Sequence, residues 1–350
     1  MVTGVNGLFG VESPIVLGPF GGLSSTELTA TVSNLGGLGS FGLYGYEPER
    51  IRQTARALRE LTPKPFALNL WVPRDDAVPA DIPSEEYERF AAVLEPFFRE
   101  VGAEVPSRPE RFLPSFDEQI EAVLELAPAV VSFVFGLPSA SLVEAAQSKG
   151  IVVVGTATTV DEARYLEEGG ADAIVATGLE AGGHRVSFLR GAEESLVGSF
   201  ALIPQVADAV SVPVIAAGAI GDRRSVAGAF ALGASGVQVG TAFLATRQSA
   251  TNDTHREAIR VATADGTVLT RAMSGRLARG IPNRAIRTIE QSGVIAPFPL
   301  QNWLTGRFRA EANKQGNGEL QSLWAGQAAA LARHTDAADV YAELLAGVPR

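Results

Sequence analysis

The 350-residue sequence contains no cysteine, and this absence excludes several kinds of chemistry at once. A chain without thiols has no disulfides, no thiolate nucleophile, no cysteine-bound zinc and no iron–sulfur cluster. Histidine is scarce, with three residues, and the only lysines are Lys64, Lys149 and Lys314. The histidines lack the spacing of metal ligands, so we expect no bound metal. Any redox chemistry would therefore need an organic cofactor.

Positive charge is also in deficit over the chain as a whole. The net charge is −10 and the isoelectric point is near 5.0, so the surface would repel a phosphate backbone and we expect no nucleic-acid partner. Long apolar runs are missing too: none approaches the ~18 residues of a membrane span, and Met1 to Glu12 lack the pattern of a secretory signal. We therefore expect a cytoplasmic protein with no membrane partner.

The sequence does contain a hydrophobic fraction of 46%, arranged as short apolar runs that alternate with segments of helical period. This alternation indicates an α/β protein built from successive βα units around a parallel sheet. The predicted strands are Pro14–Phe20, Leu38–Gly42, Phe66–Val72, Val130–Gly136, Ile151–Ala157, Ala173–Thr177, Pro213–Ala217 and Gly236–Gly240. Eight strands close a (β/α)₈ TIM barrel, which is the predicted fold. An open doubly wound sheet is the alternative, because periodicity alone does not show closure.

Two segments fall outside the repeat. The insertion 73–115 follows the third strand and contains an amphipathic stretch, Glu85–Arg99, and a second block covers 251–350. In barrel enzymes, insertions at the carboxyl ends of strands form lids or substrate domains. We therefore expect a barrel formed by 1–72 and 116–250, with a smaller, mainly helical substrate or lid domain formed by 73–115 and 251–350. The alternative is that both segments are peripheral decoration.

Small-residue turns end the last two predicted strands. They read Val214-Ile215-Ala216-Ala217-Gly218-Ala219-Ile220 and Gly236-Val237-Gln238-Val239-Gly240-Thr241-Ala242-Phe243. A phosphate group needs several converging backbone N–H donors, and small residues let the backbone approach it closely. Barrels commonly build a phosphate site after these two strands. The pair therefore predicts phosphate binding, whereas either turn alone would equally suit an ordinary βα connection.

The segment after the sixth strand carries the histidine that we single out. It reads Thr177-Gly178-Leu179-Glu180-Ala181-Gly182-Gly183-His184-Arg185. Paired glycines allow a backbone turn close to a flat ligand, and a histidine at a strand end suits proton transfer or anion binding. We therefore predict a functional role for His184 rather than a structural one. His255 and His334 lie in polar, helix-like segments, and we expect both to be solvated.

Asn69 places an amide in the otherwise apolar third strand. An unpaired buried amide costs roughly 1–3 kcal/mol, so it should have a partner. A flavin ring edge would be one such partner, and a backbone group is the ordinary alternative. The turn Leu17-Gly18-Pro19-Phe20-Gly21-Gly22-Leu23 would let main chain lie against a planar ring, but it also suits a plain strand-to-helix turn. No Rossmann fingerprint or P-loop is present.

Together these features resemble the nitronate monooxygenase family, whose members are FMN-containing TIM barrels. The resemblance covers most of the chain, including Pro14–Gly22, Val32–Ser40, the strand with Asn69, Glu180–Arg185, both phosphate turns, Thr270–Arg276 and Leu323–Gln327. It implies FMN as the cofactor and His184 as the catalytic residue. The residues implied to contact FMN are Pro19, Phe20, Gly21, Asn69, Thr177, Gly182, Gly183, Gly218, Ala219, Gln238, Val239, Gly240 and Thr241.

The resemblance also implies a reaction, in which an alkyl nitronate is oxidised with O₂ to a carbonyl compound and nitrite. His184 would orient or charge-balance the nitronate, or take a carbon-bound proton from a neutral nitroalkane. The partners expected are this small-molecule anion and O₂, and a homodimer is compatible with the sequence.

Four positions depart from the family pattern. Ala219 stands where members usually have glycine, and its methyl group is tolerable only if φ there is negative. Thr177 stands where relatives often carry glutamine. Val134 and Phe298 replace a histidine and a tyrosine of some bacterial members, which makes the expected pocket more apolar.

Three alternative functions remain at this point. An NAD(P)H-dependent FMN reductase of the same barrel group, such as an enoyl-acyl-carrier-protein reductase or a quinone reductase, would share these motifs. A phosphate-sugar lyase or isomerase would share the phosphate turns, but no lysine lies at a strand end for Schiff-base chemistry. A non-catalytic flavin-binding or phosphate-ligand-binding barrel is the third alternative.

Overall fold

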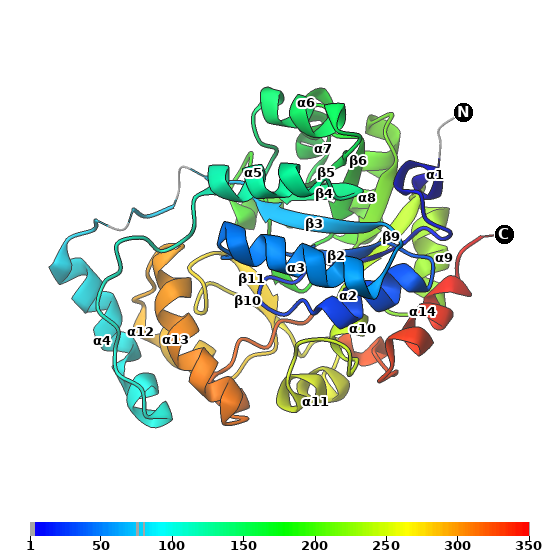
Figure 1. Cartoon of the computed structure of the whole chain (residues 1–350). Helices are drawn as coiled ribbons and strands as arrows, with labels where there is room; N and C mark the ends of the chain where they lie inside the picture. The colour runs from blue at the N-terminus through cyan, green and yellow to red at the C-terminus, as the bar shows by residue number, and fades with distance from the viewer. Residues whose placement is uncertain (1–3, 75–76, 80, 350) are drawn as a thin grey trace.

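A computed structural model describes residues 4–74, 77–79 and 81–349, and Figure 1 shows the arrangement of its helices and strands. Asp75 and Asp76, in the acidic start of the predicted insertion, lie outside the described residues, as does the beginning of the predicted N-terminal barrel segment, 1–3.

The described residues form a main sheet of eight parallel strands, which confirms the predicted barrel. Its strands are β1 (Ile15–Leu17), β2 (Gly39–Gly42), β3 (Phe66–Trp71), β4 (Val130–Val134), β5 (Val152–Ala157), β6 (Ala173–Thr177), β8 (Val214–Ala217) and β9 (Gly236–Val239). The order is β1-β9-β8-β6-β5-β4-β3-β2. The ends meet where Leu38 N donates to Ile15 O and Leu17 N donates to Leu38 O, both at 2.9 Å. This closure excludes the open-sheet alternative.

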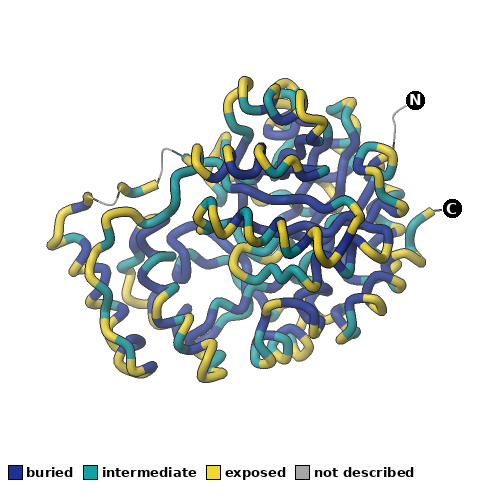
Figure 2. Tube along the Cα trace, viewed as in Figure 1, coloured by how far each residue is buried: buried dark blue, intermediate teal, exposed yellow. Residues whose placement is uncertain are grey.

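Helices surround the barrel, and most of them alternate buried residues with exposed residues on their outer faces (Figure 2). They are α2 (Thr26–Asn34), α3 (Pro48–Leu61), α5 (Phe116–Leu126), α6 (Ala140–Ser148), α7 (Val160–Glu168), α8 (Ser199–Ala209), α9 (Arg223–Ala231), α10 (Thr241–Leu244) and α14 (Ala337–Leu345). The short α1 (Val5–Phe9) packs Val5 and Phe9 against the amino ends of the strands, with Leu38 and Val130. One end of the barrel is thereby filled with apolar side chains, and the carboxyl ends are left for a site.

A separate layer lies beyond the carboxyl ends of the strands (Figure 1). It contains α4 (Ser84–Val101), α12 (Arg284–Ser292), α13 (Leu300–Lys314) and a small antiparallel sheet of β7 (Gly183–His184), β10 (Val268–Thr270) and β11 (Ala278–Gly280). Short helical turns at Ala192–Ser195, Gly318–Leu320 and Ala329–Leu331 and helix α11 (Asp253–Val261) complete the chain. We call α4, α12 and α13 the cap.

The cap joins the two segments that the sequence sets outside the repeat. Phe97 and Phe98 of α4 pack against Phe308 of α13, with ring centroids 5.3 and 5.6 Å apart. The last helix behaves differently, because α14 packs against α2 and α9 on the barrel. None of the described helices is long and apolar enough to cross a membrane.

Candidate active site

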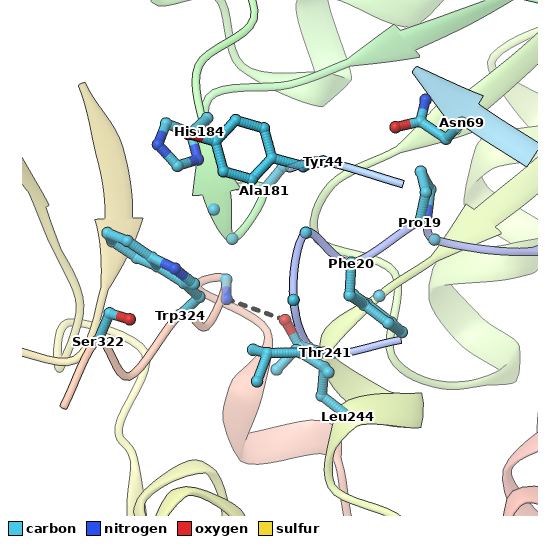
Figure 3. Close-up of a pocket in the computed structure, with 18 of the residues that line it drawn as sticks. Pro19, Phe20, Tyr44, Asn69, Ala181, His184, Thr241, Leu244, Ser322 and Trp324 are labelled. Atoms are coloured by element: carbon cyan, nitrogen blue, oxygen red, sulfur yellow. Dashed lines mark hydrogen bonds between the residues drawn. The ribbon is translucent and has the colours of Figure 1, made fainter. Parts of the chain in front are cut away.

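A cavity of about 580 Å³ opens at the carboxyl ends of the barrel strands and is also lined by residues of α13 in the cap. Figure 3 shows part of its lining. Its size lies within the usual range for cofactor and substrate pockets. The predicted site residues that line it are Pro19, Phe20, Gly21, Asn69, Thr177, Gly182, Gly183, His184, Gly218, Ala219, Gln238, Gly240 and Thr241. Val239 does not line it, because its side chain is fully buried in the barrel core beside Leu17 and Phe243.

The two small-residue turns form one end of the cavity. Among the described residues, the backbone N–H groups of Gly218, Ala219, Ile220, Gly240 and Thr241 donate no hydrogen bond to the protein. They belong to two adjacent strand ends, β8 and β9, and the turns that carry them line the same cavity. Several unpaired N–H groups on neighbouring turns are the donor set that an anionic phosphate requires.

Ala219 corrects one expectation from the sequence. Its φ is +57°, after +94° at Gly218, so the methyl group is carried in the left-handed region and not at a negative φ. Two successive residues with positive φ form a tight turn directly after β8, and the N–H groups of this turn have no partner among the described residues. The turn therefore has the backbone conformation expected of a glycine pair, although the Cβ of Ala219 disfavours the positive φ that this conformation requires.

A second part of the cavity wall is formed where the backbone at Gly182 packs closely against another segment. An ideal Cβ on Gly182 would lie 2.6 Å from the carbonyl carbon of Ala325 and from the nitrogen of Gly326. Gly326 N in turn donates to Thr241 Oγ1 at 3.0 Å, the bond drawn in Figure 3. The loop before His184, segment 324–326 and the start of α10 are thus packed together, and Gly182 has to be a glycine for this contact.

Asn69 on β3 has an ordinary partner for one half of its amide. Its Nδ2 donates to Ser132 O and Ser132 Oγ on β4, at 3.2 and 3.0 Å. No described donor reaches its Oδ1, which faces the cavity (Figure 3). Asn69 therefore offers a hydrogen-bond acceptor to a ligand from an otherwise apolar strand.

Two indole rings pack against His184. Its ring centroid is 4.9 Å from that of Trp71 and 5.5 Å from that of Trp324. The backbone is held because β7 pairs with β11, where His184 faces Ala278. The imidazole is therefore held at the cavity wall by two indole contacts and by its main chain.

A hydrogen bond sets the tautomer of His184. Its Nε2 lies 2.8 Å from Ser274 Oγ, and that hydroxyl donates its own hydrogen to Arg276 O at 3.0 Å. Ser274 must therefore accept from His184, which places the ring hydrogen on Nε2. Nδ1 then carries a lone pair and has no partner among the described residues.

Burial, together with the charges of Arg276 and Arg309, lowers the pKa of His184 from 6.5 to about 3. The ring is consequently neutral at physiological pH. It can accept a proton or a hydrogen bond at Nδ1, but it does not supply a positive charge.

The positive charge of the cavity comes from arginine. Arg309 of α13 lines the cavity and donates to Ser322 Oγ at 2.6 Å and to Asn302 Oδ1 at 2.7 Å, and its Nε is buried without a partner. Burial lowers the pKa of Arg309 to about 10, which leaves it charged at neutral pH. No carboxylate in the described part of the chain pairs with it. A guanidinium with only neutral partners attracts an anion.

Three positions that depart from the family pattern lie in or beside the cavity wall. Val134 and Thr177 line the cavity. Phe298 stacks on Trp71 with centroids 5.9 Å apart, and the Arg276 guanidinium lies 4.1 Å from its ring centroid. The wall is apolar at Val134 and Phe298, as the sequence indicates.

His255 corrects a second expectation. It is 3% exposed and lines the cavity, and its Nε2 lies 3.0 Å from Trp324 O, so it donates there. Burial lowers its pKa to about 4, although the bond to Trp324 opposes this. The sequence indicates a polar helix around His255. Its imidazole is buried because the chain at Trp324 packs against that helix. His334 is partly exposed.

Sequence reasoning missed several residues of the cavity. Tyr44, Trp71, Asn302, Arg309 and Trp324 all line it. Trp71 and Trp324 lie in segments that resemble the family but were not singled out, and the other three lie outside those segments. They come from a loop after β2, from β3, from α13 of the cap and from the segment after Gly318–Leu320, and the fold brings them together. No cluster of three or more potential metal ligands occurs among the residues that the structure describes.

Comparison with known proteins gives consistent matches over the whole chain. The sequence profile of a family described as nitronate monooxygenase matches residues 3–347. A nitronate monooxygenase of Pseudomonas aeruginosa is 41% identical over 343 residues, covering 97% of this chain and 97% of the relative. The structure of nitroalkane oxidase from Streptomyces ansochromogenes has a TM-score of 0.86 at 33% identity, covering 98% and 96%. FabK from Thermotoga maritima has a TM-score of 0.75 at 28% identity, covering 99% and 96%.

Proposed function

Because this chain belongs to the nitronate monooxygenase family, we propose that it oxidises alkyl nitronates with a bound FMN and O₂. The products would be a carbonyl compound and nitrite, and neutral nitroalkanes would be slower substrates. The observation that carries the proposal is that one cavity contains both Arg309, which has no carboxylate partner among the described residues, and a neutral His184. Arg309 would attract an anion into the cavity, and the unprotonated Nδ1 of His184 would face that anion.

The residues present fit FMN. Its phosphate would accept hydrogen bonds from the unpaired N–H groups of the turns at Gly218–Ile220 and Gly240–Thr241. Oδ1 of Asn69 suits the N–H on the pyrimidine edge of a flavin ring. Pro19, Phe20 and Gly21, from the turn after β1, would lie against the ring. When bound, the flavin would accept electrons from the nitronate and pass electrons to O₂.

The remaining site residues belong to the same proposal. Thr177, Gly182 and Gly183 would lie near the ring from the β6 side, and Gln238 from β9. Val239 would contribute main chain only, since its side chain belongs to the core.

Arg309 would hold the negative charge of the nitronate. A guanidinium presents several N–H donors in a plane, and the nitronate group has two oxygens in a plane, as a carboxylate has. The indoles of Trp71 and Trp324, which pack against His184, would exclude water from this part of the cavity. In such a site an ionic hydrogen bond is stronger than it is in water.

For a neutral nitroalkane, Nδ1 of His184 would take the proton from the carbon that carries the nitro group. The C–H bond breaks, its electron pair moves into the nitro group, and the imidazole becomes an imidazolium. The pKa of about 3 makes His184 a weak base in the empty cavity. Proton transfer nevertheless adds no net charge, so the arginines that disfavour the imidazolium favour the nitronate formed beside it. This balance is why we expect nitroalkanes to react, but more slowly.

The cap would act as the lid of this site. Segments 73–115 and 251–350, expected as the substrate domain, supply α4, α12 and α13, and α13 contributes Asn302 and Arg309 to the cavity. We propose that closing and opening of this layer governs substrate access, with α14 remaining part of the barrel wall.

Anaerobic titration of the purified flavoprotein tests the assignment. Propane-2-nitronate should alter the flavin spectrum without a nicotinamide, and admission of air should release nitrite and acetone. NADPH and NADH in parallel titrations should leave the flavin oxidised. Rapid bleaching by either nicotinamide, with no nitrite from the nitronate, would instead identify a reductase of the FabK type.

A further inference from the structure

We infer that the phenolic O–H of Tyr44 is the hydrogen-bond donor for the oxygens of the bound nitro or nitronate group. Asn302 orients this donor and Arg309 orients Asn302, so the cap and barrel build the subsite together. The inference rests on the proposed function, because it names the residue that would recognise the substrate's oxygens.

The donor is identified by following each hydrogen. Asn302 Nδ2 donates to the Tyr44 hydroxyl oxygen at 2.8 Å. A phenol has one hydrogen to donate, and an amide nitrogen cannot accept it. No other described residue hydrogen-bonds to the hydroxyl, and Tyr44 lines the cavity. The phenolic hydrogen is therefore left for a ligand.

The amide of Asn302 has only one orientation that suits both neighbours. Arg309 donates from Nη2 to Asn302 Oδ1 at 2.7 Å, so the amide oxygen must face the guanidinium. The amide nitrogen then faces Tyr44. Each bond polarises the next in the same sense, from the charge of Arg309 to the phenol, which strengthens Tyr44 as a donor.

The position of Tyr44 suits a ligand that also meets His184. The Tyr44 and Trp71 ring centroids are 4.4 Å apart, and the Trp71 and His184 ring centroids are 4.9 Å apart, so Trp71 contacts both residues. Figure 3 shows the Tyr44 ring extending from its backbone toward the part of the cavity where His184 lies. A planar ligand there could meet the phenol with its oxygens and Nδ1 of His184 with its carbon.

Burial raises the pKa of Tyr44 to about 12, despite the opposing effects of Asn302, Arg309 and Arg276. The phenol consequently keeps its hydrogen over the whole range in which the enzyme would be assayed. When a proton leaves the carbon of a nitroalkane, negative charge develops on the nitro oxygens. A donor placed before the reaction stabilises that charge more than it stabilises the neutral reactant.

The test uses isobutyrate, a carboxylate that resembles propane-2-nitronate in shape and charge but cannot release nitrite. Binding to the flavin-loaded enzyme at pH 8 is measured by calorimetry, with neutral isobutyramide as a second probe. Tyr44→Phe should raise the isobutyrate dissociation constant roughly ten- to a hundredfold, the usual loss for a hydrogen bond to a charged group. The matched control is Tyr46→Phe, since Tyr46 accepts only from Arg50 at the surface and should leave binding unchanged.

Asn302→Asp tests the orientation. A carboxylate at this position only accepts, so it would stay paired with Arg309 and capture the Tyr44 hydrogen. Isobutyramide binding should weaken in this variant too, although that probe carries no charge to be repelled. In a Tyr44→Phe background the same substitution should have no further effect on isobutyramide.

The outcomes separate the two proposals. Nitrite release by the wild type together with unchanged isobutyrate binding in Tyr44→Phe would overturn the donor role and leave the proposed function intact. A wild type that binds no isobutyrate, or a Tyr44→Phe variant that loses flavin but not isobutyrate, would also overturn it. Tyr44-dependent binding without any nitrite would support the donor and remove the proposed reaction.

Discussion

Ser274 Oγ lies 2.8 Å from Nε2 of His184 and must accept its hydrogen, because the hydroxyl already donates to Arg276 O. This one contact decides which nitrogen of the ring faces the substrate. A residue in the connection between β10 and β11 thus determines which ring nitrogen of His184 is free to meet a ligand.

Ser274→Ala should free the imidazole to adopt either tautomer. We expect turnover of neutral nitroalkanes to fall roughly three- to tenfold, the usual worth of a single neutral hydrogen bond. Nitrogen-15 spectra of histidine-labelled protein report the ring hydrogen directly. The wild-type His184 signal should show a protonated Nε2 and a bare Nδ1 at pH 7, and the variant should show exchange between the two. A wild-type spectrum with the hydrogen on Nδ1 would contradict the assignment.

His184→Ala should retain flavin but lose about 10²–10⁴-fold in turnover of a neutral nitroalkane, the typical contribution of a general base. The loss with a preformed nitronate should be much smaller, because no carbon-bound proton has to leave. His334→Ala is the control, since His334 does not line the cavity. Equal losses with both substrates would mean that His184 acts after proton removal.

The fold was predictable because its strands are buried on both faces. A near-continuous apolar run as short as Phe66–Trp71, in a chain rich in amphipathic helices, fits a buried strand much better than a helix, and each predicted strand overlaps an observed one. Strand ends are less predictable: the sequence indicates Pro14–Phe20 where the structure has Ile15–Leu17. Hydrophobicity predicts which residues are buried, whereas the residue at which a strand ends depends on its hydrogen bonds with the neighbouring strands.

The cavity was only half predictable for a related reason. Glycine turns and His184 lie in contiguous motifs, so their sequence carries the signal. Tyr44 and Arg309 are 265 positions apart in the numbering and meet through Asn302, which no local pattern indicates. The backbone of Ala219 shows the same limit, since residue type favours a negative φ and the surrounding turns impose a positive one.

Buried His255 should make the protein less stable in mild acid. Its pKa is lowered to about 4 from 6.5, so between those values the unfolded chain binds a proton that the folded chain does not. Stability therefore falls as pH drops below 6.5, and at pH 5 the loss is roughly 2 kcal/mol. His255→Gln keeps a donor for Trp324 O but does not titrate. Urea unfolding at pH 7 and pH 5 should show a smaller difference in the variant, and His334→Gln should retain the wild-type difference.

Ala219 should prefer to be glycine. A side chain in the left-handed region destabilises the folded state by roughly 1–2 kcal/mol. Glycine removes this strain but lowers stability by about 0.4–1 kcal/mol, because it increases the conformational freedom of the unfolded chain. Ala219→Gly should therefore stabilise the protein by up to about 1 kcal/mol and keep its flavin.

Ala219→Val should do the opposite, since a β-branched residue tolerates positive φ poorly and would turn the N–H groups of Ala219 and Ile220 away from the phosphate. Thermal unfolding and flavin content per chain measure both effects. Full flavin retention in Ala219→Val would show that these N–H groups do not hold the cofactor, because the substitution acts on the backbone and removes no side-chain contact.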